Sequence, residues 1–89
     1  MKPKILSYLL ANPNSRKRSI ANALNIWQCD VKFLSTMCEL EQKGIIKSTY
    51  HREPENMEFY DTFEVNPNWV DTVKWCLAQN FSEKDWERA

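Results

Sequence analysis

The sequence predicts a mainly α-helical domain with one small β-hairpin, an α+β fold of three helices, a two-stranded hairpin and a C-terminal helix. Three observations support this prediction. Apolar residues recur at helical spacing in four segments. Between the third and the fourth segment, the apolar pattern changes to every second residue on both sides of a Pro/Asn turn. The only glycine, Gly44, follows the longest helical pattern directly, as a left-handed C-cap requires.

The first two helices are expected at about residues 3–11 and 16–24. Pro3 suits a helix start, where the missing N–H has no helical partner in any case. The Asn-Pro-Asn-Ser sequence at 12–15 stops the first helix, and Asn14 or Ser15 can cap the second. Asn25 fits the left-handed position after the second helix. The apolar faces are Ile5, Leu6, Leu9 and Leu10, followed by Ile20, Ala21 and Leu24.

The third helix is expected at about residues 30–43, with Cys29 or Asp30 near its start. Glu39 and Lys43 have the favourable i,i+4 order for an ion pair on its surface. Its buried stripe is predicted to contain Phe33, Leu34, Met37 and Leu40, with Val31 and Cys38 as further candidates.

The hairpin is expected at about residues 45–52 and 57–65, joined by a Glu-Pro-Glu-Asn turn. Asn66 and Pro67 break the second strand, and Asn68 can cap a fourth helix at about residues 69–80. Residues 1–81 then form a single domain, and residues 82–89 form a polar tail that contains Trp86. A chain of 89 residues supports one core.

The formal net charge is zero, but the charges are unevenly distributed. Residues 1–50 carry eight basic and three acidic side chains, whereas residues 51–89 carry four basic and nine acidic ones, so the halves have net charges of +5 and −5. The positive half can approach phosphates even though the whole chain is neutral.

Several classes of function are disfavoured. The three cysteines are widely spaced and lack the paired spacing of a zinc site. One glycine cannot build a glycine-rich phosphate loop. We therefore expect no enzyme, no metal and no cofactor. No apolar run is long enough to span a membrane and no signal peptide is recognised, so a cytoplasmic location is expected.

One string, SRKRSIANALNIWQCDVKFLSTMCELEQKGIIKS at residues 15–48, combines an I-A-x-x-L-x-I pattern (residues 20–26) with an L-x-x-K-G-x-I ending (residues 40–46). With the following hairpin, residues 15–65 resemble the winged helix-turn-helix domain of small bacterial, plasmid and phage DNA-binding regulators. The resemblance implies sequence-specific binding of double-stranded DNA and regulation of transcription. The sequence departs from the family pattern in two places. The stretch of residues 26–33 is about two residues longer than the usual spacing between the turn and the recognition helix. The hairpin tip is acidic, so we expect that it does not enter a minor groove.

In that family the second helix begins at the phosphate backbone and the third lies in the major groove. The resemblance therefore assigns backbone contacts to Arg16, Lys17, Arg18 and Lys47, and base readout to Gln28, Lys32, Ser35 and Thr36. The alternative interpretation of the basic residues is a run of solvated surface charges. The alternative for the four readout candidates is an ordinary polar helix face.

The tryptophans separate into two groups. Trp27 is expected to pack in the core rather than to stack in solvent. In the acidic half, Trp75, Phe81 and Trp86 are candidates for a partner or homodimer surface. The alternative function is a winged-helix module for protein–protein interaction, an inhibitor or adaptor that docks a protein partner through the acidic C-terminal half.

Overall fold

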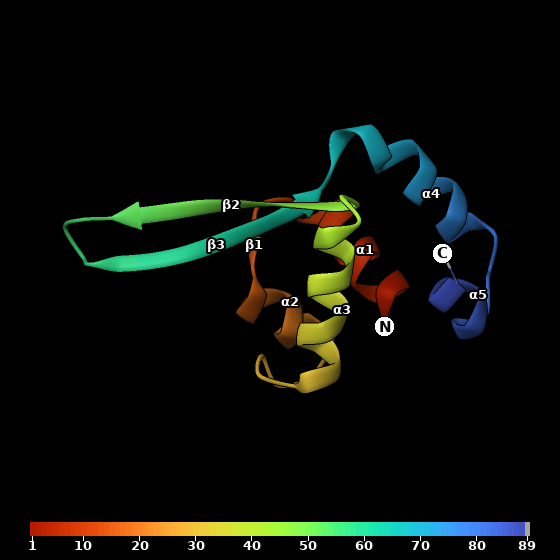
Figure 1. Cartoon of the computed structure of the whole chain (residues 1–89), viewed down its shortest axis with the longest axis horizontal. Coiled ribbons are helices and arrows are strands. Elements are labelled where there is room, and N and C mark those ends of the chain that lie inside the picture. The colour runs from red at the N-terminus through yellow and green to blue at the C-terminus, as the bar shows by residue number, and fades with distance from the viewer. Residues whose placement is uncertain (89) are drawn as a thin grey trace.

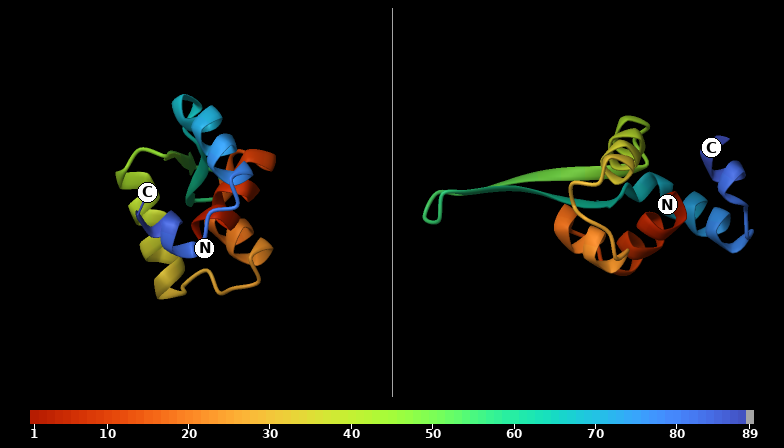
Figure 2. Two further views of the ribbon diagram at one scale, coloured as in Figure 1. Left: turned by 90° about the vertical axis from the view of Figure 1, so that its right-hand side faces the viewer. Right: turned by 90° about the horizontal axis from the view of Figure 1, so that it is seen from below.

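A computed structural model describes residues 1–88, including every side chain except those of residues 83, 87 and 88. Its first elements are α1 (Lys2–Ala11), β1 (Ser15–Arg16), α2 (Lys17–Ala23) and α3 (Val31–Gln42). They are followed by β2 (Ile46–Glu53), β3 (Glu58–Val65), the 3-10 turn η1 (Pro67–Trp69), α4 (Val70–Ala78) and α5 (Glu83–Arg88). The ribbon of β2 and β3, the wing, projects from the helical body, and α4 and α5 lie at the end away from the wing tip (Figures 1 and 2).

Most helix ends follow from local chemistry. The Asp30 carboxylate accepts from the Phe33 N–H at 2.9 Å and caps α3. Gly44 has a φ of 76° and Asn25 a φ of 58°, so both occupy the left-handed region after a helix. The left-handed positions predicted for Gly44 and Asn25 are confirmed, and of the two residues expected near the start of α3, Asp30 is the N-cap.

The caps predicted for the second and fourth helices are wrong. Asn14 is itself left-handed, with a φ of 59°, and the Ser15 hydroxyl donates back to the Asn12 carbonyl at 2.6 Å. The backbone stays extended through Arg16, so α2 begins without a side-chain cap. Before α4, Asn66 rather than Asn68 supplies the cap: its carboxamide oxygen accepts from the Asn68 N–H at 3.0 Å and so opens η1.

The sheet has three antiparallel strands in the order β1-β3-β2. In the hairpin, Ile46 pairs with Val65, and the register continues outward to Glu53 opposite Glu58. The two-residue strand β1 was not predicted. It pairs Ser15 with Phe63, and so short a strand has no periodicity of its own because it forms only against β3.

The core lies where α1, α2 and α3 meet the inner end of the wing. Its largest fully buried side chains are Ile5, Leu6, Leu9, Ile20, Phe33, Leu40 and Ile46. Val31 and Cys38, proposed for the buried stripe of α3, are exposed instead, and Leu34 is about one-third exposed. At 100° per residue Val31 and Cys38 lie about 160° and about 140° around the helix from Phe33, so both face away from the core.

The C-terminal segment also differs from the expected polar tail. Glu83–Arg88 form α5, and the Ser82 hydroxyl accepts from the Asp85 N–H at 3.3 Å at its start. Trp86 is only 7% exposed and belongs to the core cluster. The indole supplies enough apolar surface to hold this short helix against the rest of the domain.

Candidate nucleic-acid interface

The basic run, Arg16, Lys17 and Arg18, lies where β1 ends and α2 begins. The pairing of β1 with β3 brings this run against the wing. The Arg16 guanidinium lies over the Tyr60 ring, with 3.7 Å from Cζ to the ring centroid, and its Nη2 is 3.8 Å from Glu58 Oε2. The Lys17 ammonium is 5.7 Å from the Phe63 ring centroid. Arg18 is exposed and has no ion-pair partner among the side chains that the structure describes.

An open hollow of about 280 Å³ connects this run with one predicted readout residue. Gln28 comes from the loop before α3 and lines the hollow together with the basic run. The lining residues are Arg16, Lys17, Arg18, Gln28, Tyr60, Asp61 and Phe63. The hollow thus brings together the three cationic side chains of the basic run and the Gln28 carboxamide, and the wing adds the Asp61 carboxylate.

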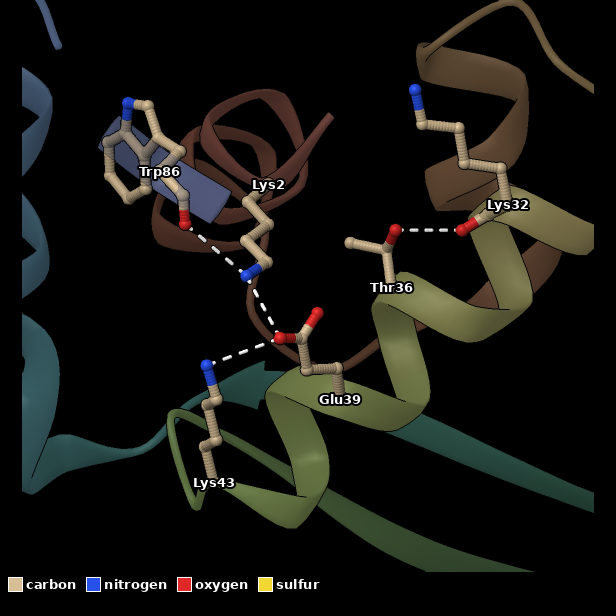
Figure 3. Close-up of polar contacts among 6 residues, drawn as sticks. All are labelled: Lys2, Lys32, Thr36, Glu39, Lys43 and Trp86. Carbon is tan, nitrogen blue, oxygen red and sulfur yellow. Dashed lines mark hydrogen bonds and ion pairs between the residues drawn. The ribbon is translucent and has the colours of Figure 1, made fainter. Parts of the chain in front are cut away.

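Three of the four predicted readout residues, Lys32, Ser35 and Thr36, share one side of α3 at i, i+3 and i+4, and Gln28 lies in the loop before the helix. Ser35 is exposed and points outward from α3, on the side opposite the buried Phe33 and Met37. Lys32 and Thr36 lie on a flank of the helix that continues to Glu39 and toward α1 (Figure 3). The half-buried Thr36 hydroxyl donates to the Lys32 carbonyl at 2.7 Å, which satisfies it within the helix. Of the residues on α3, Ser35 is therefore the best placed for contact with a ligand, and Lys32 is exposed beside it.

An ion-pair cluster holds the Lys32 flank of α3 to both ends of the chain (Figure 3). The Glu39 carboxylate is 3.2 Å from the ammonium groups of both Lys2 and Lys43. The Lys2 ammonium also donates to the Trp86 carbonyl at 3.3 Å. Hydrogen bonds from the two lysines lower the pKa of the Glu39 carboxyl below its usual 4.5. Around Glu39 this flank serves the assembly of α1, α3 and α5, whereas Lys32, near the start of α3, remains exposed.

The wing is predominantly acidic beyond its inner end. Lys47 is exposed on β2 and lies opposite Glu64 in the register. At the tip, Glu53 accepts a hydrogen bond from the Tyr60 hydroxyl at 3.0 Å. Carboxylates at a wing tip repel phosphates. That the wing tip stays out of a minor groove remains a prediction from these charges.

Sequence reasoning missed the exposed apolar residues at the start of α3. Trp27, expected in the core, is 80% exposed, and Val31 is 78% exposed. For Val31 the signal was available, since its angular position around the helix opposes that of Phe33. For Trp27 no local signal existed, because an irregular turn assigns no face.

The candidate partner surface in the C-terminal half is only partly exposed. Trp75 on α4 is 60% exposed, and Phe81 touches it edge-on with ring centroids 6.1 Å apart. Trp86 is buried behind Phe81, at 6.2 Å between centroids, so its inclusion in that surface is wrong. Its ring packs inward because α5 folds back onto the start of α1.

Metal-binding groups, cysteines and membrane-spanning helices were considered for the part of the chain that the structure describes. Within residues 1–88, the described side chains form no group of three or more His, Cys, Asp or Glu placed to hold a metal ion. Cys29 and Cys38 are exposed and Cys76 is half-buried, and all three are free thiols. None of the described helices combines the length and the apolar character that crossing a membrane requires.

The comparisons with known proteins point to one group of folds. No protein-family model and no curated protein matches the sequence. The solved structure of the PcaV transcriptional regulator from Streptomyces coelicolor, in complex with its natural ligand, has a TM-score of 0.63 at 10% identity over 97% of this chain and 64% of PcaV. A MepR mutant from S. aureus bound to an oligodeoxyribonucleotide has a TM-score of 0.58 at 17% identity, over 98% of this chain and 68% of that one.

Lactococcus lactis ZitR, also in a mutant form, has a TM-score of 0.59 at 17% identity, over 98% of this chain and 66% of that one. The present chain therefore spans about two thirds of the length of these proteins. At such low identity the likeness concerns the fold. Together with the order of elements and the hairpin, it establishes a winged-helix domain.

Proposed function

We propose that this chain binds double-stranded DNA in a sequence-specific manner and regulates transcription. The observation that carries the proposal is the position of the basic run, which lines one hollow together with Gln28 from the loop before α3. PcaV and SlyA are transcriptional regulators, and one MepR mutant was solved with an oligodeoxyribonucleotide. A cytoplasmic location and a role other than that of an enzyme follow from the proposal.

The proposed division of labour follows the geometry. Arg18, which is exposed, provides the main backbone contact, with Lys17 and Arg16 beside it and Lys47 at the inner end of the wing. Ser35 and Lys32 on α3, with Gln28 before it, read bases in the major groove. Thr36 has a lesser part because its hydroxyl is already bonded within the helix.

The proposal is tested by equilibrium binding to a random duplex pool at several salt concentrations. We expect log K to fall linearly with log salt, with a slope of about 0.9 for each phosphate neutralised. The double variant R16A/R18A should lose affinity for all sequences alike and should lose about two units of that slope. The matched control is K74A/K84A, which removes the same charge from exposed positions on α4 and α5.

Equal losses in the two double variants would overturn the assignment of the basic run. No binding at micromolar protein, with the helical circular dichroism intact, would reject DNA binding and favour the interaction module that uses the acidic half.

We also propose a homodimer in which Trp75 and Phe81 form the contact. Both side chains are exposed on the α4–α5 end of the molecule, away from the wing. Helix-turn-helix proteins commonly bind two DNA half-sites as dimers, and an exposed aromatic surface away from the wing could form the contact between the two subunits. Light scattering should give twice the chain mass for the wild type and the chain mass for W75A. A monomeric wild type at all concentrations would reject the homodimer.

A further inference from the structure

The outward face at the start of α3 is uncharged and largely apolar. Val31, Ser35 and Cys38 follow one another at i, i+4 and i+7, so they form one stripe along the helix. All three are exposed, and Leu34 lies beside them with about a third of its surface in solvent. None of these four side chains carries a charge.

The core does not account for this stripe. Phe33, Met37 and Leu40 fill the opposite side of α3 and are fully or almost fully buried. Val31 is the first residue of the helix, where its aliphatic side chain gains nothing from packing inside the domain. A binding partner that covered this valine would remove its apolar surface from water, which is favourable.

The charges around the stripe define its occupant. Lys32 borders it on α3, and the basic run lies at the start of α2, the helix before it. Two carboxylates also lie at its ends, but Asp30 accepts from the Phe33 N–H and Glu41 accepts from the Ser48 hydroxyl. A binding partner that complements this surface therefore has an apolar centre between anionic borders, and it has a groove that accommodates one helix. The major groove of B-DNA fits this description, because it is wide enough for an α-helix and lies between two phosphate backbones. Its one apolar group is the C5 methyl of thymine.

We propose that α3 recognises thymine through the C5 methyl group, with Val31 and Leu34 as the specificity-determining residues. This inference rests on the proposed function and deepens it. Val31 contacts one methyl group at the N-terminal end of the helix, and Leu34 contacts a second one turn further along. The preferred sequences therefore carry thymines at fixed positions, in place of the guanines that arginine side chains read.

The experiment starts with selection of preferred duplexes from a random pool. Each thymine of a selected duplex is then replaced singly by deoxyuridine, which keeps the base pair and removes only the methyl group. We expect binding to weaken about fourfold at each contacted position, because one methyl group loses its burial. V31A should bind the thymine and the deoxyuridine duplex equally at one position, and L34A should do so at another.

The matched control is T72A, which also truncates an exposed β-branched residue on a helix, but on α4. It should retain the full fourfold discrimination. Affinity that stays unchanged when every thymine is replaced would overturn the methyl readout and leave DNA binding intact. A loss of discrimination in T72A equal to that in V31A would overturn the assignment of Val31. If the pool yields no bound sequence and no salt-dependent binding, DNA binding and methyl readout are both rejected.

Discussion

The Arg16 guanidinium lies over the ring of Tyr60, with Cζ 3.7 Å from the ring centroid. The same ring stacks against His51, whose centroid is 4.9 Å away with an interplanar angle of 13°. His51 in turn forms a hydrogen bond with the Thr62 hydroxyl at 2.8 Å. This contact joins the start of α2 to the middle of the wing, so it restrains how the wing projects from the helices.

Replacing the ring should weaken that connection. Y60L removes the aromatic face, and we expect the free energy of unfolding to fall by about 0.5–1 kcal/mol, the usual size of an exposed cation–π contact. Y60F is the matched control, because it keeps the ring and removes only the hydroxyl that donates to Glu53. Urea denaturation measures both variants. Equal losses would show that the hydroxyl, and not the ring, stabilises the wing.

Trp86 and Trp75 should respond in opposite ways to truncation. W86A removes a buried indole and should cost about 3 kcal/mol of unfolding free energy, together with the helicity of α5. W75A removes an exposed indole and should change stability by less than about 0.5 kcal/mol in dilute monomer. Denaturation with circular dichroism detection compares them. A W86A protein as stable as the wild type would contradict the docking of α5.

Glu39 should make stability depend on pH in the acid range. Its pKa is lowered by the hydrogen bonds from Lys2 and Lys43, so below 4.5 the unfolded chain binds a proton that the folded chain still excludes. The contribution is complete above about pH 4.5 and is lost as the pH falls through the lowered pKa.

Urea midpoints from pH 3 to 7 test this prediction. The difference between the wild type and E39Q should be largest near neutral pH and should shrink as the pH falls below 4.5, because protonation progressively removes the Glu39 charge that the lysines stabilise. E55Q, at the exposed wing tip, should give no such difference. A gap between wild type and E39Q that is constant with pH would contradict the assignment to the lysine pairs.

Cys38 offers a direct test of which face of α3 contacts DNA. Its thiol is exposed on the same stripe as Val31 and Ser35, whereas Cys76 is half-buried on α4. A saturating selected duplex should slow alkylation of Cys38 severalfold and leave Cys76 unchanged, since access limits the reaction of a thiol. Peptide mass mapping after timed alkylation measures each site. Alkylation of Cys38 at the same rate with and without DNA would remove this stripe from the interface.

The sequence was a sound guide to most features whose decisive interactions are local, although the caps predicted for the second and fourth helices are wrong. Asp30 caps α3 through an N–H three residues away. Gly44 ends the helix by its own backbone conformation. The hairpin has a period of two, and its partners lie close in the chain. Such signals involve neighbouring residues, so the helices, the wing and the resemblance to a winged helix could be predicted.

The candidate site was predictable only in part, for the same reason. The position of the basic run next to the second helix is a local property, and the sequence located it. Helical spacing alone places Lys32, Ser35 and Thr36 on one side of α3, but their exposure depends on how α3 is rotated against the core. That rotation leaves Lys32 and Ser35 exposed and Thr36 half-buried.

By itself, then, the sequence determined the order of the first four helices and the hairpin, the left-handed positions of Asn25 and Gly44, and the asymmetry between a positive and a negative half. Only the tertiary structure decided that β1 joins the sheet, that Trp86 is buried and that Trp27 and Val31 face solvent. Each of these outcomes depends on contacts between segments far apart in the chain, such as that between Lys2 and Trp86. Burial depends on what every other segment leaves uncovered, and no local pattern encodes that.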